Sequence, residues 1–336
     1  MNNPKAKPLK VTIVTPNKYS AWPLIGSING MLVCIYTVAD QHVSTQASLY
    51  LKTSTTNGLT WSKPQEIFTE KTGIKGITGV GYNKEGDMLL WYRNGLWGPD
   101  VNDGQPPVTH QLYKTDGKTV TLLSSPDLTL HGGHIGNIFR IPNKGLFAFY
   151  NSYGELRSWG VLKSVDEGVS WEQIPIEENI PMDECPVEIE CAYIEDNKIL
   201  VLGRKDTEKG TMAMFQIQSC DWGETWTKEY TNITDSYGNS PSVIYDNKTG
   251  IINLYYFVRF EGELKRRIVN FNDVWNSPQN WSDSEVLVTE PYRGWDTGNV
   301  KTVALKDEHI CTYYAGTETT TGVFGVIMKP DNEKQI

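Results

Sequence analysis

Alternating apolar and polar residues recur along the chain as pairs of short strands joined by polar turns. The first pair lies at 22–36, WPLIGSINGMLVCIY, and the second at 78–93, TGVGYNKEGDMLLWYR. Each has two apolar runs on either side of a turn with Gly, Asn or Asp, a pattern typical of a β-hairpin. Four more pairs follow at 136–150, 189–204, 241–259 and 299–314. The pattern therefore predicts an all-β chain built from six copies of one unit.

A second pattern repeats in step with the hairpins. The stretches SVDEGVSW at 164–171 and SCDWGETW at 219–226 share serine, aspartate, glycine and tryptophan at the same offsets, and STTNGLTW at 54–61 is a looser copy. The tryptophan recurs at steps of 110, 55 and 55 residues, as Trp61, Trp171, Trp226 and Trp281. Repeats of about this length are typical of solenoids and propellers.

The repeated motif predicts a tight turn between two strands. The carboxylate of Asp166 or Asp221 can accept backbone N–H bonds across the turn, and the following Gly168 or Gly223 can adopt positive φ. The large tryptophan ring is expected to pack between neighbouring units. We therefore interpret the motif as a folding element and not as a catalytic one.

Four strands per unit and six units predict a six-bladed β-propeller with four-stranded antiparallel blades, whose closure removes long free sheet edges. Only three strands follow residue 296, and the last of them is TGVFGVIM at 321–328. The early stretch KVTIVTP at 10–16 can supply the fourth. We therefore expect the N-terminal strand to close the last blade, and a single domain over 1–336.

Charge and cysteine content narrow the function. With a formal net charge of −9, the chain is not expected to bind nucleic acid, because phosphate binding needs clustered Lys and Arg. The tight basic cluster KRR at 265–267 is expected to be a solvated strand edge. The five cysteines have no spacing that suits zinc or a redox pair, so we expect neither a metal nor a cofactor.

Membrane and export signals are also missing from the pattern. No apolar stretch approaches the roughly 18 residues of a membrane span, so no membrane insertion is expected. The first residues, MNNPKAKPLK, lack the apolar run of a secretory signal. These features favour a soluble protein, either cytoplasmic or incorporated in a virion or similar particle.

The motif S-x-D-x-G-x-[ST]-W resembles the Asp-box, or BNR repeat, of the sialidase superfamily. Two copies match fully, a third has Thr56 in the aspartate position, and Trp281 alone remains of a fourth. The resemblance covers nearly the whole chain and implies a sialidase-like propeller. It implies less about activity, because in that family Asp-boxes lie at blade turns away from the central axis.

The resemblance also implies a set of site residues. Sialidases hold the substrate carboxylate with three arginines, whose bidentate guanidinium groups suit it. They also use a tyrosine nucleophile activated by a glutamate, and an aspartate as general acid. The stretch PVEIECAYIEDNKILVLGR resembles the part of the family sequence in which a glutamate precedes the second arginine, which maps onto Glu188 or Glu190 and onto Arg204. Arg93 has the equivalent place in the second unit, and Arg259 is a candidate third arginine.

Two parts of the family pattern have no counterpart. The stretch SAWPLIGSINGML has Ala21 or Trp22 where the first family arginine would stand. In the sixth unit, RGWDTGNVKTV resembles the DTGYPS-like opening of divergent sialidase-like hydrolases, with Asp296 present and no matching tyrosine. An orthodox sialidase is therefore not expected.

Propellers bind ligands at one mouth of the central channel, where the loops converge. Glu188 and Glu190 point to one face of a strand, and two carboxylates with separated pKa values can serve as acid and base at a glycosidic bond. Glu190 and Asp296 are therefore the catalytic candidates. The candidates for substrate binding are Arg93, Arg204, Arg259, Glu188, His134, Trp295 and Arg293. Each also has a structural alternative: the arginines can pair with buried carboxylates, and the aromatic rings can pack between blades.

The mouth is thus predicted to recognise a glycan or a cell-surface polysaccharide, and two functions stay open. One is an exo-glycosidase, a glycoside hydrolase that acts on an acidic sugar through Glu190 and Asp296. The other is a non-catalytic carbohydrate-binding module, such as the receptor-binding part of a phage tail. The missing catalytic residues and the missing signal favour the module, and a rigid assembly platform is a third reading.

Overall fold

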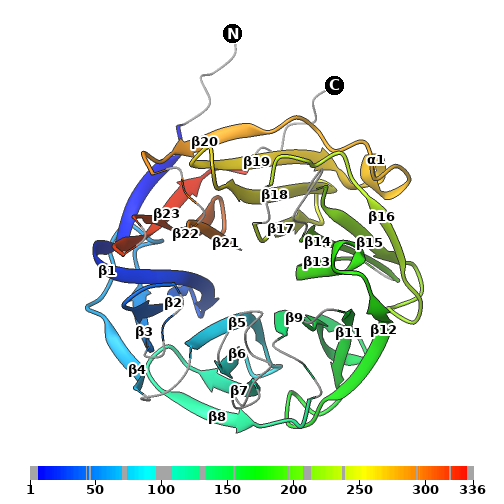
Figure 1. Cartoon of the computed structure of the whole chain (residues 1–336), viewed down its shortest axis with the longest axis horizontal. Helices are drawn as coiled ribbons and strands as arrows, with labels where there is room; N and C mark the ends of the chain where they lie inside the picture. Colours follow the sequence, from blue (N-terminus) through cyan, green and yellow to red (C-terminus); the bar gives the residue numbers. More distant parts are fainter. Residues whose placement is uncertain are drawn as a thin grey trace.

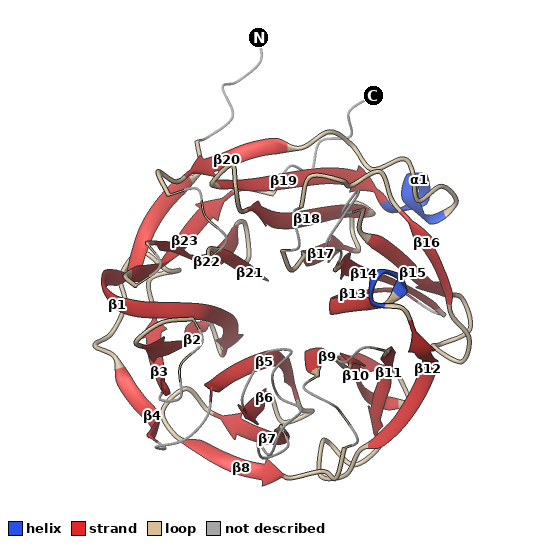
Figure 2. Cartoon of the chain, in the orientation of Figure 1, coloured by secondary structure: helices blue, strands red, loops and turns tan. Residues whose placement is uncertain are grey.

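Strands arranged in a ring of sheets make up the protein, as the computed structural model shows (Figure 1). The structure describes residues 7–42, 44, 47–69, 74–95, 108–128, 130, 133–153, 156–195, 197–206, 213–236, 239–292, 294, 296–317 and 319–330. Figure 2 shows how little of the ring is helical. Among the described residues, the helices are η2 (Met182–Glu184) and α1 (Phe271–Trp275), and neither is long and apolar enough to cross a membrane.

Four of the sheets are four-stranded and antiparallel, with strands that follow one another in sequence. Blade 2 consists of β5 (Ile74–Tyr82), β6 (Met88–Gly95), β7 (Thr109–Thr115) and β8 (Val120–Ser124). Blade 3 consists of β9 (His134–Ile141), β10 (Gly145–Asn151), β11 (Arg157–Ser164) and β12 (Glu172–Ile180). Blade 4 consists of β13 (Pro186–Glu195), β14 (Lys198–Lys205), β15 (Phe215–Ser219) and β16 (Thr227–Tyr230). Blade 5 consists of β17 (Ser242–Asp246), β18 (Ile251–Val258), β19 (Glu263–Asn270) and β20 (Glu285–Thr289).

The remaining sheet has seven strands and joins the two ends of the chain. Its order is β21 (Gly298–Ala304), β22 (His309–Gly316), β23 (Thr321–Met328), β1 (Leu9–Ile28), β2 (Met31–Ala39), β3 (Ala47–Ser54) and β4 (Gln65–Thr69). The first half of β1 pairs with β23, and its second half pairs with β2. The sheet therefore consists of blade 6 (β21 to β23 and the first half of β1) and blade 1 (the second half of β1 to β4).

This pairing confirms that the N-terminal strand closes the last blade. Leu9 lies opposite Ile327, and Tyr19 lies opposite Ala39. The structure differs from the expectation in one respect: one continuous strand serves both blades, where the sequence suggested a separate strand at 10–16. The register shifts between Val14 and Lys18, which lets the strand change partner without a turn.

The burial of the strands explains why the hairpins were visible in the sequence. Strands β18 and β23 are buried at every position, whereas the outer strand β12 has no buried residue. A middle strand is covered by the neighbouring blade on each face, so it is apolar throughout. The outer strand faces solvent, so it carries charges.

The repeated turn has the geometry that its sequence predicts. Gly168 has φ +92°, and the Asp166 carboxylate accepts the backbone N–H of Ser170 at 2.9 Å. The ring of Trp171 lies 5.0 Å from that of Trp91, which belongs to the preceding blade. The motif therefore fixes the turn and also fills the space between two blades.

The expectation for the basic cluster at 265–267 was wrong. Lys265, Arg266 and Arg267 lie on β19 and are buried, not solvated. The three cations tolerate burial because carboxylates face them: Lys265 and Arg267 both pair with Asp235, and Arg266 pairs with Glu285.

Candidate functional site

Arginines from three blades meet at one face of the ring. Arg93 lies near the end of β6, Arg204 near the end of β14, and Arg259 directly after β18. The strands β6, β14 and β18 are each the second strand of a blade, so their ends, and the three arginines, lie at the same face of the ring. The charge of each arginine interacts with the carboxylate of Glu188. The structure thus brings together four of the residues predicted for substrate binding.

Arg204 is held from two sides. Its Nη2 lies 3.3 Å from Glu188 Oε1 and 3.1 Å from Asp206 Oδ1. Burial alone would lower the pKa of Arg204, but the two carboxylates raise it above its ordinary value. Asp206 also accepts Nη1 of the buried Arg157 at 2.8 Å. Arg204 is therefore a fixed, fully charged group.

Arg93 and Arg259 are less well compensated. Burial lowers the pKa of Arg93 to about 10, although Tyr153 and Glu188 act in the opposite direction. Burial likewise lowers the pKa of Arg259. For both guanidinium groups, the desolvation cost exceeds the attraction of the surrounding carboxylates, so a bound anion would stabilise their charge.

Bulges in the inner strands shape this face. Trp22, Glu188 and Asn299 all have positive φ, at 52°, 48° and 51°. Each lies where the register of its inner strand shifts against the second strand, on β1, β13 and β21. Such backbone strain in non-glycine residues is concentrated at functional sites, and a bulge re-aims the side chain that it carries.

Glu188 links three blades through these bulges. Its backbone N–H donates to Asn151 Oδ1 at 3.2 Å, and its carboxylate accepts a hydrogen bond from the Ser240 hydroxyl. Ser240 Oγ also lies 3.2 Å from Asn299 Oδ1. The strained glutamate of blade 4 is thus fixed by blades 3 and 5 as well as by Arg204.

Glu190 has different partners. Lys301 Nζ donates to its Oε2 at 2.8 Å, and Asn137 Nδ2 donates to its Oε1 at 2.5 Å. Glu190 and Lys301 are each only 4% exposed. Asn137 Oδ1 in turn accepts the backbone N–H of Val80 at 2.9 Å. This chain of contacts connects the inner strands β5, β9, β13 and β21.

Asp296 is surrounded by hydrogen-bond donors. Tyr314 donates to its Oδ1 at 2.7 Å and Tyr19 at 2.8 Å, and His42 Nδ1 lies 2.8 Å from the same oxygen. Burial raises the pKa of Asp296, but the contacts with His42 and the two tyrosines outweigh burial and lower it. Next along the chain, Thr297 O accepts Arg259 Nε at 3.2 Å, so Asp296 lies beside the arginines.

His134 lies close to the same arginines. Its pKa is well below the ordinary value, first because of burial and then because of Lys301, Arg93 and Arg204. Among the described residues, its Nδ1 has no hydrogen-bond partner. His134 is therefore neutral: it can donate or accept a hydrogen bond, but it does not contribute a positive charge to the site. Trp295 and Arg293, also predicted for this site, lie outside the described residues.

No protein-family model and no curated protein matches the sequence. Among solved structures, the chain is similar to a protein of unknown function from Dyadobacter fermentans, with 18% identity, a TM-score of 0.79, and coverage of 98% of this chain and 99% of that one. It is also similar to a mutant of the NanB sialidase from Streptococcus pneumoniae, with 13% identity, a TM-score of 0.72, and coverage of 95% and 70%. A third is the Trypanosoma rangeli sialidase in complex with sialic acid, with 12% identity, a TM-score of 0.70, and coverage of 95% and 58%.

The chain has a sialidase-like fold. At these identities the likeness establishes the fold alone. The chain spans somewhat more than half of the Trypanosoma rangeli protein. The sialidase-like fold agrees with what the repeated turn and the hairpin pattern predict.

Several residues of the site were missed in the sequence, among them Asp206, Tyr314, Tyr19 and His42. Asp206 comes two residues after Arg204, at the strand end, so its position could have suggested it. Tyr314 occupies the same place on β22 as Arg204 on β14, near the end of a second strand. Tyr19 and His42 carry no such signal, because only the pairing of β1 with β2 brings them near Asp296. Among the described residues, no group of His, Cys, Asp and Glu could hold a metal ion.

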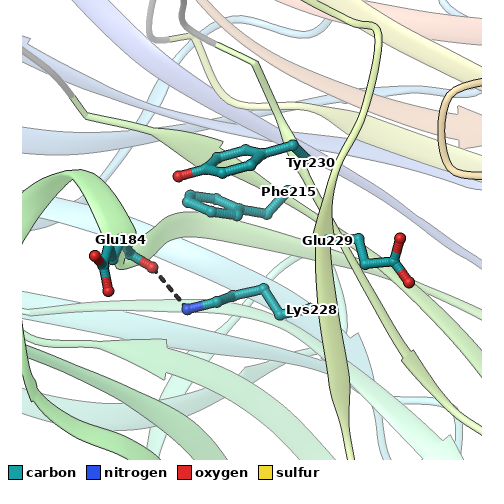
Figure 3. A pocket seen from close by; sticks show the side chains of 5 residues that line it. All are labelled: Glu184, Phe215, Lys228, Glu229 and Tyr230. Atoms are coloured by element: carbon teal, nitrogen blue, oxygen red, sulfur yellow. Dashed lines mark hydrogen bonds between the residues drawn. The ribbon is translucent and has the colours of Figure 1, made fainter.

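A cavity of about 220 Å³ on blade 4 is lined by Glu184, Phe215, Lys228, Glu229 and Tyr230, and by none of these arginines. Figure 3 shows Tyr230 stacked over Phe215, with Lys228 reaching the backbone oxygen of Glu184. Lys228 also pairs with Glu177 of blade 3. Because Lys228 joins blade 4 to Glu177 of blade 3, we interpret this cavity as part of the blade packing.

Proposed function

We propose that the protein recognises an acidic glycan at the face where Arg93, Arg204 and Arg259 meet. The observation that supports this most is the clustering of three buried arginines from three blades around Glu188. With Arg157, four guanidinium groups face the three carboxylates of Glu188, Asp206 and Asp296. A local excess of positive charge in a chain of net charge −9 favours an anionic ligand.

The ligand class follows from the geometry of the guanidinium group. Guanidinium groups bind carboxylates with two parallel hydrogen bonds, and sugars with a carboxylate include sialic and uronic acids. The Asp-box pattern and the likeness to a sialidase solved with sialic acid favour a sugar over other carboxylates. A cell-surface polysaccharide with such sugars is the partner that we propose.

The proposed site departs from that of an orthodox sialidase. If DTGN at 296–299 is aligned with the DTGY of the family opening, Asn299 takes the place of the tyrosine nucleophile. In an orthodox sialidase a glutamate activates that tyrosine. Here Ser240 lies between Glu188 and Asn299 and is within hydrogen-bonding distance of both. Glu190 is held in a buried ion pair with Lys301, so its carboxylate already has a structural partner.

Two modes of action remain within this proposal. A binding module, such as the receptor-binding part of a phage tail, needs only the arginines and is supported by the missing nucleophile. A glycoside hydrolase is supported by the strained backbone of Glu188 and by the ionised Asp296 beside Arg259.

Calorimetry with acidic and neutral sugars tests the proposal. N-acetylneuraminic, glucuronic and galacturonic acids are compared with glucose and galactose, first as monosaccharides and then on a glycan array. We expect binding of at least one acidic sugar and a loss of about tenfold or more in affinity for Arg259→Gln, because a charge-assisted hydrogen bond is removed.

The matched control is Arg140→Gln, which removes a half-exposed arginine paired with Glu167 on blade 3. It should bind as the unaltered protein does. Equal binding of neutral and acidic sugars, or equal loss in the two variants, would refute the proposal.

A further inference from the structure

His42 combines contact with a fixed carboxylate and exposure at the proposed site. It follows β2, in the segment between β2 and β3 of blade 1. Its Nδ1 lies 2.8 Å from Asp296 Oδ1 and 2.9 Å from the Tyr19 hydroxyl. Its ring makes a T-shaped contact with that of Trp22, with centroids 5.1 Å apart and planes at 84°. Its side chain is 26% exposed, against 11% for Asp296.

The carboxylate behind His42 cannot move or reach a ligand easily. Tyr19 and Tyr314 both donate to Asp296 Oδ1, and both are almost completely buried. Burial, together with the negative charge of Asp296, raises the pKa of each tyrosine, so both remain neutral donors. Asp296 is thus a fixed anion, and the tyrosines position it.

This arrangement decides which ring nitrogen exchanges a proton. A carboxylate only accepts, so the Nδ1 that faces Asp296 carries a hydrogen. The proton gained and lost by the ring is then the one on Nε2. A histidine oriented through Nδ1 by a buried carboxylate is the arrangement that supports acid–base catalysis, since the anion fixes the tautomer and stabilises the imidazolium.

The pair also lies beside the arginines. Arg259 interacts electrostatically with both Asp296 and Glu188, so it connects His42 and Asp296 to the cluster around Glu188. A sugar whose carboxylate is held by the arginines would therefore have its glycosidic bond within the same face of the ring as His42.

We propose that His42 is the catalytic acid of this site and that Asp296 is its positioning residue, so that the protein hydrolyses an acidic glycoside. This rests on the proposed function, whose acidic glycan would be the substrate. The imidazolium gives its Nε2 proton to the glycosidic oxygen as the bond from the anomeric carbon to that oxygen breaks, and the electron pair of that bond goes to the leaving oxygen. Water then adds to the anomeric carbon and releases a proton to the solvent, from which His42 is protonated again.

The test uses the full chain and acidic glycosides in pairs that differ only in the leaving group. For each acidic sugar that binds, the 2,4-dinitrophenyl and the methyl glycoside are assayed with the unaltered protein, His42→Gln, Asp296→Asn and the control Arg140→Gln. Glutamine can still donate to Asp296, so His42→Gln keeps the hydrogen bond and loses only the exchangeable proton. Thermal unfolding of each variant verifies that it is folded.

We expect His42→Gln to lower kcat for the methyl glycoside by about 100-fold or more, the range of general acid catalysis. The loss for the dinitrophenyl glycoside should be less than about tenfold, because that leaving group departs without protonation. Asp296→Asn should lower kcat with little change in KM, since Asp296 acts through His42. A merely structural role would lower both substrates equally.

The outcomes distinguish failure of the inference alone from failure of the proposed function. Binding of an acidic sugar without hydrolysis of any glycoside overturns the inference and leaves the proposed function intact. Full activity of His42→Gln, or equal losses with both leaving groups, also overturns it. If no acidic sugar binds, the proposed function fails, and the inference fails with it.

Discussion

At the scale of single residues, two glutamates two positions apart on β13 have opposite surroundings. Glu188 has a strained backbone and belongs to the arginine cluster, whereas Glu190 forms a buried ion pair with Lys301. Their spacing predicted that they share one face of a strand. The bulge between Val187 and Glu190 interrupts the regular alternation, and no residue type in that stretch signals it.

The ion pair at the centre leads to a prediction for stability. Glu190→Gln leaves the charge of Lys301 buried without its partner, which costs about 3–5 kcal/mol in such pairs. Urea unfolding should show this loss, and adding Lys301→Met should recover much of it, because the uncompensated charge is removed. Arg140→Gln, which breaks a half-exposed pair, should cost less than about 1 kcal/mol. If Glu190→Gln is as stable as the unaltered protein, the ion pair with Lys301 does not contribute to the free energy of unfolding.

At the scale of elements, the inner strands approach one another closely around the axis. Strand β9 lies between β5 and β13, and the space beside Gly136 on β9 is filled by backbone. A Cβ added there would lie 2.3 Å from the carbonyl oxygen of Ile189. The sequence predicted strand β9, but it could not predict which neighbour would leave no room for a side chain.

We therefore expect Gly136→Ala to destabilise the protein by about 1–3 kcal/mol, since the inner strands must separate to admit a methyl group. Gly76→Ala is the matched control, because Gly76 on β5 has open space beside it. The midpoint of urea unfolding should fall for the first variant and hardly change for the second. Equal midpoints for the two variants would mean that the inner strands can separate to admit the methyl group without a loss of stability.

At the scale of the whole molecule, the hairpins, the repeated turns and the closing strand were all readable from the sequence. They depend on the local alternation of the hairpins and on the fixed period of the repeated turn, which is complete in two blades and partial in others. The arginine cluster was partly readable, because Arg93, Arg204 and Arg259 occupy equivalent strand ends. The approach of His42 to Asp296 was not, since it depends on contacts between residues that are 254 positions apart.

Closure of the ring gives a prediction at this scale. Deleting residues 1–18 removes the part of β1 that pairs with β23 and exposes the edge of blade 6. We expect a lower melting temperature, a broader transition, and association in size-exclusion chromatography. Deleting residues 1–6, which precede β1, should change neither. A compact monomer with an unchanged melting temperature after the longer deletion would contradict this view of β1.

The strand shared by the two terminal blades also affects how the protein is made. Leu9 finds its partner only when Ile327 has been synthesised, so the ribosome delivers the first residues of β1 long before the strand they pair with. During elongation the first half of β1 remains unpaired in the growing chain, and blades 2 to 5 can form before β23 has been synthesised. Completion of the ring therefore comes late in the formation of the propeller, and the nascent chain is most exposed to aggregation or chaperone binding at β1.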